Sequence, residues 1–222
     1  MPQVCDEITP KSEKKRLKRN GAYAFLTPLG KIIAHSKFKI NYIGTENIPS
    51  DGGVVFASNH ITPLDPLVIA AGCNREMYFM AKKELFKKKI VGGFLGMLNA
   101  FPVDRSKFDY KSVDHAIDIV ERDGALLIFP EGTRSADFTP HKAKGGVCYI
   151  IKKSKCNTII PVSLYNDEKG KTGSKMTVRY GKPIRYSELQ FDESTEKMKD
   201  LRYASDLIMQ RISEQWEQGH ED

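Results

Sequence analysis

Two short apolar runs constrain the fold of this chain more than any other feature of its sequence. Residues 53–58 (GVVFAS) and residues 125–129 (ALLIF) each have the length and apolar character of a buried strand, and polar residues follow each run at once. Ligands of open α/β sheets bind beyond the carboxyl ends of the strands. The two runs therefore predict one site at one edge of a sheet.

The first run leads into NHITPLD, residues 59–65. A carboxylate five residues after a histidine can hold one ring nitrogen as a donor, which leaves the other nitrogen free to accept a proton. Pro63 suits the first turn of a helix, and such a turn would bring Asp65 back toward the ring of His60. The alternative for this pair alone is a surface histidine beside an aspartate that starts a helix.

The second run leads into PEGTRS, residues 130–135. Gly132 permits an unusual φ or a close approach of the backbone, and Arg134 offers a fixed fork of donors that suits phosphate. A third segment, LNAFPVDRS at residues 98–106, places Arg105 in the same way as a second candidate clamp. The alternatives are a turn with a surface ion pair for the second segment and a solvated loop arginine for the third.

A fourth segment, TIIPVSL at residues 158–164, predicts a strand, and its proline favours an edge strand or the first residues of a strand. Taken in order, the four segments resemble the motifs of the glycerolipid acyltransferase family, specifically the 1-acylglycerol-3-phosphate acyltransferases. The family carries Asn-His-x4-Asp, Phe-Pro-x-x-Arg, Phe-Pro-Glu-Gly-Thr-Arg-Ser and Ile-Pro-Val blocks, which stand here at residues 59–65, 101–105, 129–135 and 160–162. The resemblance extends over roughly residues 37–185.

The resemblance implies transfer of a fatty acyl group from a thioester to the sn-2 hydroxyl of lysophosphatidic acid, giving phosphatidic acid. His60 would act directly as the general base, and Asp65 would orient its ring and stabilise the imidazolium as it forms. The expected donor is acyl-CoA or acyl carrier protein, with no cofactor. The alternatives are the same chemistry on glycerol-3-phosphate or another lysophospholipid, or a non-catalytic lipid-binding protein on the same fold.

The remaining candidate residues are expected to bind substrate. They are Arg105, Glu131, Gly132, Thr133, Arg134 and Lys144, the last within a Lys-Gly segment that also resembles the family. By resemblance Glu131 contributes to acceptor binding, and the Gly132 amide is a candidate donor to the developing oxyanion. Thr133 and Ser135 are candidate hydrogen-bond donors or, alternatively, helix N-caps. An apolar tunnel would hold the acyl chain, with Phe94, Leu95, Met97 and Leu98 as candidate lining or, alternatively, as core residues.

The net charge of +7 and pI near 9.1 favour anionic partners such as a phospholipid surface or phosphorylated substrates. A nucleic-acid binder is an alternative that rests only on charge, and we expect no nucleic-acid partner because neither zinc-finger spacing nor an aromatic RNA-binding motif is present. Four cysteines without a C-x-x-C pair indicate free thiols in a reducing compartment, and the scattered histidines predict no metal site. No apolar run reaches the ~18 residues that suggest a spanning helix. We therefore expect a peripheral protein at the cytoplasmic face of the membrane.

The predicted fold is a single α/β domain, with a mixed or largely parallel sheet flanked by helices and an N-terminal amphipathic helical pair. Residues 1–36 are expected to form a basic membrane-interface segment, and residues 37–222 the acyltransferase domain. Residues 17–36 could also form one helix kinked at Pro28 that packs on its own domain. Residues 82–97 predict a helix broken at two adjacent glycines, whose lysines form a solvated face or a second headgroup-binding patch. Strand order is not predicted.

Overall fold

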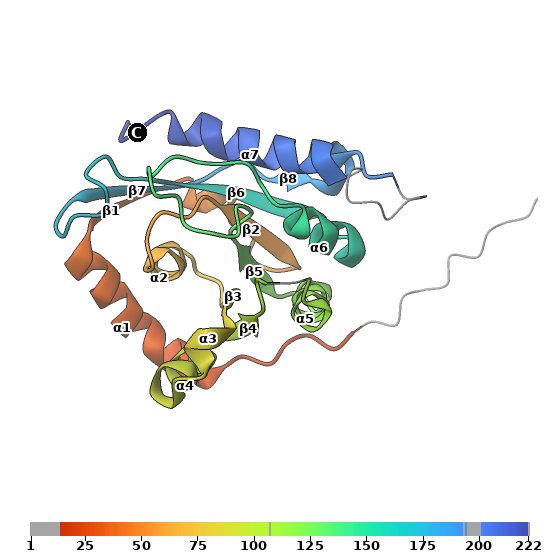
Figure 1. Ribbon diagram of the computed structural model, residues 1–222, viewed down its shortest axis with the longest axis horizontal. Helices are drawn as coiled ribbons and strands as arrows, with labels where there is room; N and C mark the ends of the chain where they lie inside the picture. The colour runs from red at the N-terminus through yellow and green to blue at the C-terminus, as the bar shows by residue number, and fades with distance from the viewer. Residues whose placement is uncertain (1–13, 107, 193, 195–200, 222) are drawn as a thin grey trace, which may run out of the picture.

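The computed structural model describes residues 14–106, 108–192, 194 and 201–221. Within these residues, one mixed sheet of eight strands lies between two layers of helices (Figure 1). The strands are β1 (Lys39–Ile43), β2 (Val54–Ser58), β3 (Met77–Lys82), β4 (Ala100–Val103), β5 (Ala125–Ile128), β6 (Thr158–Tyr165), β7 (Lys175–Tyr180) and β8 (Ile184–Arg185). The helices are α1 (Gly21–Lys37), α2 (Asp65–Ala71), α3 (Lys83–Phe86), α4 (Lys89–Met97), α5 (Tyr110–Glu121), α6 (Gly146–Ser154) and α7 (Arg202–Trp216), with short 3₁₀ turns at Thr45–Asn47 and Tyr186–Leu189.

The strand order is β1-β7-β6-β2-β5-β3-β4, and β8 pairs with β6 beyond the end of β7. Strands β6, β2, β5, β3 and β4 are mutually parallel, whereas β7 and β8 run antiparallel to β6. The sheet is therefore mixed and largely parallel, as the sequence predicted. Its parallel block brings the carboxyl ends of β2, β5 and β4 to the same edge, and those ends carry the three polar motifs.

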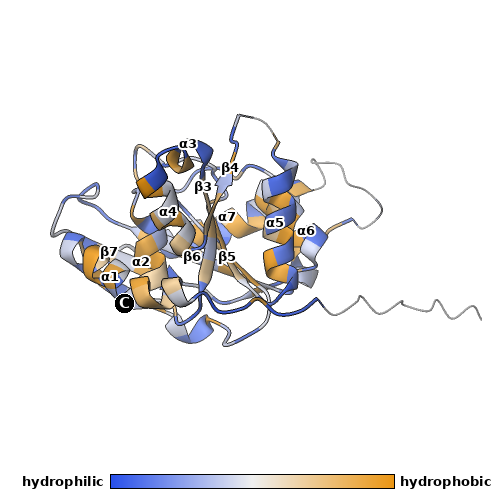
Figure 2. Ribbon diagram, turned by 90° about the horizontal axis from the view of Figure 1, so that it is seen from below, coloured by the Kyte–Doolittle hydropathy of each residue, from blue (hydrophilic) through white to orange (hydrophobic). Residues whose placement is uncertain are grey.

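Alternate residues of the central strands supply two separate cores, because successive side chains of a strand point to opposite faces. Phe56 and Leu127 belong to the core beneath α1 and α2, whereas Val55 and Leu126 belong to the core beneath α5, α6 and α7. Figure 2 shows α1, α2 and α4 on one side of the strands and α5 and α6 on the other. Coverage of both faces explains why the central strands are continuous apolar runs.

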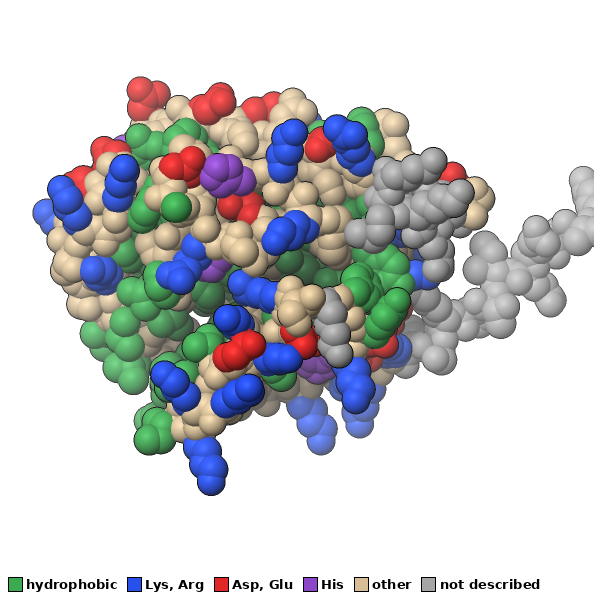
Figure 3. Space-filling view, in the orientation of Figure 1, with side chains coloured by type: hydrophobic (Ala, Val, Ile, Leu, Met, Phe, Trp, Pro, Cys, Tyr) green, Lys and Arg blue, Asp and Glu red, His purple; other side chains and the backbone are tan. Residues whose placement is uncertain are grey.

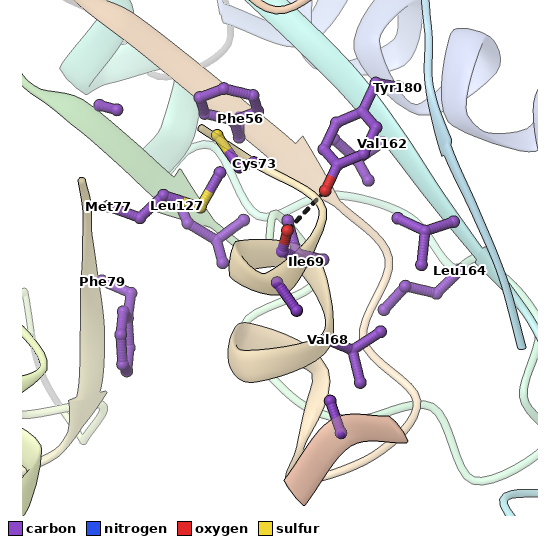
Figure 4. Close-up of a cluster of buried hydrophobic side chains, with 14 of the residues drawn as sticks. Phe56, Val68, Ile69, Cys73, Met77, Phe79, Leu127, Val162, Leu164 and Tyr180 are labelled. Carbon is purple, nitrogen blue, oxygen red and sulfur yellow. Dashed lines mark hydrogen bonds between the residues drawn. The ribbon is translucent and has the colours of Figure 1, made fainter. Parts of the chain in front are cut away.

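Helix α2 is fixed to the sheet by two tyrosine hydroxyls. Tyr180 donates to the carbonyl of Ile69 (Figure 4), and Tyr42 donates to the carbonyl of Val68 over 3.0 Å. The last carbonyls of a helix lack the usual partner one turn further on, so the Tyr42 hydroxyl supplies a donor to Val68, and the Tyr180 hydroxyl adds a second donor to Ile69, which also accepts from the Gly72 amide. Gly72 makes room for both rings, since a Cβ there would lie 2.3 Å from the Tyr42 ring. The opposite end of this short helix carries Asp65.

Three local predictions were wrong. In the part of the chain that the structure describes, α1 is a single helix that begins at its Asn20 cap and contains Pro28, so no N-terminal pair is formed. The break in residues 82–97 falls between α3 and α4 at Lys87 and Lys88, and Gly92 lies inside α4. Strand β6 is central, because Pro161 faces the gap between β7 and β8, where its missing N–H costs no ladder bond.

The predicted C-terminal helix is α7, which begins at Arg202, while residues 195–200 of that prediction lie outside the described residues. Among the helices that the structure describes, none is long and apolar enough to cross a membrane.

Candidate active site

His60 and Asp65 are in direct contact where β2 ends. The Nδ1 atom of His60 lies 2.7 Å from Oδ2 of Asp65, whose side chain is fully buried. The same carboxylate accepts from the amide of Ile61 at 2.6 Å, from the amide of Thr62 at 2.9 Å and from the hydroxyl of Thr62 at 2.6 Å. The carboxylate is thus an acceptor to its neighbours, so Nδ1 of His60 is the donor to it and Nε2 is left to accept a proton.

The loop that carries His60 is joined to its neighbours through its backbone. The Asn59 side chain donates to the carbonyl of Leu164 and accepts from its amide, at 2.9 and 2.8 Å, which ties the loop to β6. The Ser135 amide donates to the His60 carbonyl at 2.7 Å, which ties it to the loop after β5. Asn59 thus has a structural role. No helix begins at Ser135, so the N-cap alternative for that residue is wrong.

Phe129 and Glu131 surround the histidine from the β5 side. The Phe129 ring stacks on the His60 ring with centroids 4.0 Å apart and 19° between the planes. Glu131 is only 4% exposed, and its carboxylate accepts one long bond of 3.4 Å from the His60 amide. Burial raises the pKa of Glu131 to about 7, although hydrogen bonds from the backbone of His60 and His141 act in the opposite direction. Near neutral pH this carboxyl is therefore partly protonated.

Gly132 links two of the predicted substrate-binding residues. Its φ of +70° lies in the left-handed region that glycine adopts without strain, and a Cβ there would lie 3.2 Å from Cδ of Lys144. Its carbonyl accepts from Nη1 of Arg105 at 2.9 Å. Its amide donates to the carbonyl of Phe129 at 3.0 Å, within the turn. This amide is therefore already paired, which argues against the oxyanion role expected for it.

Arg105 and Arg134 are close enough to influence each other. The pKa of Arg105 is lowered first by burial and then by the positive charge of Arg134. Two cations held near each other favour an anion at that place, although the charge of Glu84 acts on the pKa of Arg105 in the opposite direction. Thr133 and Arg134 are both exposed, so their side chains are available to a ligand.

Two hollows adjoin the site. An apolar cavity of about 240 Å³ lies between β5, α5 and α6, with Arg105, Gly132 and Lys144 among its lining residues. A more polar hollow of about 690 Å³ lies on the other side of the PEGTRS loop and includes Thr62, Thr133 and Arg134. Arg105 and Arg134 were predicted to lie in one place, and they line two neighbouring hollows.

Most of the side chains that line the apolar cavity were not predicted from the sequence. The residues that line this cavity include Met80, Phe108, Val113, Phe129, Val147 and Ile150. Of the residues predicted to line a tunnel, Leu98 is buried in the other core, Phe94 and Leu95 pack against that core, and Met97 is 43% exposed. For Phe94, Leu95 and Leu98 the structure therefore agrees with the alternative of core packing, because α4 covers the opposite face of the sheet. The inward periodicity of α5, which includes Val113, was the only available signal.

The thiols do not compete with His60 as reactive groups. Cys73, Cys148 and Cys156 are free and buried, and burial raises the pKa of each to about 11. Cys5 lies outside the described residues. Over the same described part of the chain, no three His, Cys, Asp or Glu side chains cluster closely enough to hold a metal ion.

Comparison with known proteins agrees with this geometry. A family model described as Acyltransferase matches residues 39–165, which is more than half of the chain and includes all four motifs. The chain therefore belongs to the acyltransferase family of enzymes.

Curated relatives and a solved structure extend the likeness to most of the chain. The 1-acyl-sn-glycerol-3-phosphate acyltransferase of Bacillus subtilis is 29% identical over 196 residues, which cover 86% of this chain and 96% of that protein. The enzyme of the same name from Streptococcus pneumoniae is 29% identical over 212 residues, covering 91% and 78%. The crystal structure of the LPA acyltransferase PlsC from Thermotoga maritima matches 90% of this chain and 81% of its own, with a TM-score of 0.69 at 20% identity. That structural match confirms the fold.

Proposed function

We propose that this enzyme transfers a fatty acyl group from a thioester donor to the sn-2 hydroxyl of lysophosphatidic acid, giving phosphatidic acid for phospholipid biosynthesis. The observation that carries the proposal is the 2.7 Å contact between His60 and the fully buried Asp65. The names of the curated relatives support this choice of acceptor. The donor is acyl-CoA or acyl carrier protein.

His60 acts as the general base. Nε2 takes the proton of the acceptor hydroxyl while the hydroxyl oxygen attacks the thioester carbonyl, and Asp65 stabilises the imidazolium that forms. Collapse of the tetrahedral intermediate forms the new ester, breaks the carbon–sulfur bond and returns the proton to the thiolate. No covalent enzyme intermediate is needed, and no described cysteine has an accessible low-pKa thiol.

Arg105 and Arg134 clamp the acceptor phosphate, with Lys144 beside them. A phosphate between the two arginines relieves their mutual repulsion, and bidentate contacts fix the distance from the phosphate to the reacting hydroxyl. Glu131, protonated in part near neutral pH, holds the glycerol by donating or accepting a hydrogen bond. Thr133 offers a further hydroxyl at the edge of the same loop.

The acyl chain of the donor occupies the apolar cavity behind Gly132. Val113 and Ile150 lie in its wall, and Arg105 of the phosphate clamp also lines it. Each buried methylene contributes about 0.8 kcal/mol, so the length of the cavity selects among donors.

Membrane contact begins at α1. Phe25, Leu29 and Ile32 are 83%, 46% and 65% exposed, so this helix presents an apolar stripe that its own domain does not cover. We assign residues 1–36 to a membrane-interface segment at the cytoplasmic face and residues 37–222 to the acyltransferase domain. An interfacial helix of this kind lies in the headgroup region without spanning the bilayer.

The test is release of free thiol from acyl-CoA, measured with lysophosphatidic acid, with glycerol-3-phosphate and without acceptor. The expected result is release stimulated by lysophosphatidic acid and reduced ~10²–10⁴-fold in His60→Ala. His115→Ala, which removes an exposed imidazole from α5, is the matched control and should retain full activity. Thiol release stimulated by glycerol-3-phosphate and not by lysophosphatidic acid would identify glycerol-3-phosphate as the acceptor. No thiol release from either acyl-CoA or acyl carrier protein donors would favour a lipid-binding protein.

The phosphate clamp has its own test. Arg105→Lys and Arg134→Lys should raise the KM for lysophosphatidic acid, because lysine cannot reproduce the bidentate fork. Arg202→Lys, on the 82% exposed start of α7, is the control. An unchanged acceptor KM in both clamp variants would remove these arginines from the acceptor site.

A further inference from the structure

Helices α3 and α4 form an exposed unit with two properties that rarely occur together on a solvated surface. Ile90 is 90% exposed, and Leu85, Val91 and Met97 are 41%, 39% and 43% exposed. Five lysines stand around these apolar side chains: Lys82, Lys83, Lys87, Lys88 and Lys89. We call this set of residues the α3–α4 tip.

The charge of the tip is only partly balanced. Lys83 pairs with Asp104 at 2.5 Å, and Lys82 lies 3.9 Å from Glu84. Within the described residues, no acidic side chain pairs with the three consecutive lysines 87–89, all of which are exposed. An exposed isoleucine beside unpaired lysines is complementary to a surface that is anionic outside and apolar within.

The tip lies beside the apolar stripe of α1. The Asn20 side chain, which caps α1, donates to the carbonyl of Met97 at 3.2 Å and to Asn99 at 2.6 Å. Figure 3 shows hydrophobic side chains over α1 next to basic side chains over α3 and α4, along the lower edge of one face. The two apolar areas therefore belong to one continuous side of the molecule, so both can meet the same plane.

The tip is also connected to the candidate active site. Asp104, which holds Lys83, immediately precedes Arg105, and Arg105 donates to the carbonyl of Gly132. Docking of the tip would therefore place the phosphate clamp at a set height relative to lipid headgroups.

We infer that the α3–α4 tip is a second membrane-docking surface, which binds anionic phospholipid through the lysines at 87–89 and inserts Ile90 below the headgroups. It acts with α1 as a two-point contact that sets the orientation of the domain. The inference rests on the proposed function, because a bilayer-resident acceptor is what makes a fixed orientation useful.

The experiment measures co-sedimentation of the full chain, without acyl donor, with vesicles of phosphatidylcholine or of equimolar phosphatidylcholine and phosphatidylglycerol. A triple variant, Lys87→Gln with Lys88→Gln and Lys89→Gln, should bind the anionic vesicles about a hundredfold more weakly, since each lysine contributes about fivefold. Its binding to neutral vesicles should not change. Ile90→Ser should weaken binding to both kinds of vesicle about tenfold.

The matched control removes three positive charges from the opposite side of the sheet, through Arg202→Gln, Arg211→Gln and Lys182→Gln, and should bind as the wild type does. Wild-type affinity in both tip variants would overturn the inference and leave α1 as the sole contact. So would unchanged vesicle binding combined with weaker use of acyl carrier protein, which would make the lysines a docking site for an acidic protein.

The two proposals fail separately. All the substituted side chains are exposed, and the tip variants should keep the wild-type kcat on a short-chain, water-soluble lysophosphatidic acid. A chain that binds vesicles through the tip but releases no thiol would overturn the proposed reaction and leave the docking surface standing. Normal thiol release by a protein whose vesicle binding does not depend on the tip would overturn the docking surface and leave the proposed reaction standing.

Discussion

The buried carboxyl of Glu131 gives the most quantitative prediction. Its pKa is about 7 in the folded protein against 4.5 ordinarily, because burial opposes ionisation. Between these two values the folded state holds a proton that the unfolded state has lost. Stability therefore falls as the pH rises through this window, by about 1.4 kcal/mol per pH unit and about 3 kcal/mol in total. The sign of this pH dependence is opposite to that of an ion-paired carboxylate, which gains stability as the pH rises.

Glu131→Gln keeps the shape of the side chain and removes the titration. The variant should match the wild type in stability near pH 4.5 and exceed it by about 3 kcal/mol near pH 8. Urea unfolding at a series of pH values measures the free energy of unfolding directly. Glu46→Gln, at an exposed position in the turn after β1, is the control and should leave the pH profile unchanged. Parallel profiles for Glu131→Gln and the wild type would refute the argument that burial dominates at this carboxyl.

Three further predictions follow from the site. Asp65→Asn should lower kcat about a thousandfold with little change in KM. The reason is that a carboxylate about 4 Å from an imidazolium contributes about 4 kcal/mol at an effective dielectric of about 20. Steady-state thiol release measures both kinetic constants. Gly132→Ala should lower stability by about 1 kcal/mol, because its φ of +70° is strained for alanine, and should displace Lys144; thermal unfolding tests this. Val113→Phe should shorten the apolar cavity and reduce kcat/KM for long-chain donors more than for short-chain donors, and a series of acyl-CoA lengths measures the ratio.

The candidate site was predictable from sequence because its parts are local. A strand that ends at Ser58 and a helix that begins at Asp65 leave a loop too short for His60 and the carboxylate to separate. The mixed, largely parallel sheet was predictable for a similar reason, since alternating strand and helix patterns need crossover connections. In both cases the information lies within a few tens of residues.

Features that depend on contacts between distant segments were not predictable. The insertion of β7 between β1 and β6 is one, because nothing local specifies which strands pair. The position of Gly92 is another: it lies inside α4, where a Cβ would meet the backbone of Phe86 at 2.9 Å, so the glycine permits close packing of α3 and does not end the helix. The burial of Glu131 is a third, because it is caused by loops that come from β2 and from after β5.

The origin of each group in the site also decides what its loss should do. The proposed base, His60, lies in the loop after β2, and Asp65 begins the helix that follows. Asn59 ties this loop to β6 and Ser135 ties it to the β5 side, so the geometry of the pair exists before substrate binds. The side chains proposed to bind phosphate, Arg105 and Arg134, come from two other loops, and the positive charge of Arg134 lowers the pKa of Arg105. A damaged base should therefore lower kcat, whereas a damaged clamp should first raise the acceptor KM. If clamp variants lowered kcat alone, the arginines would have to act on the transition state. The assignment of catalysis to His60 and Asp65, and of acceptor binding to the arginines, would then be wrong.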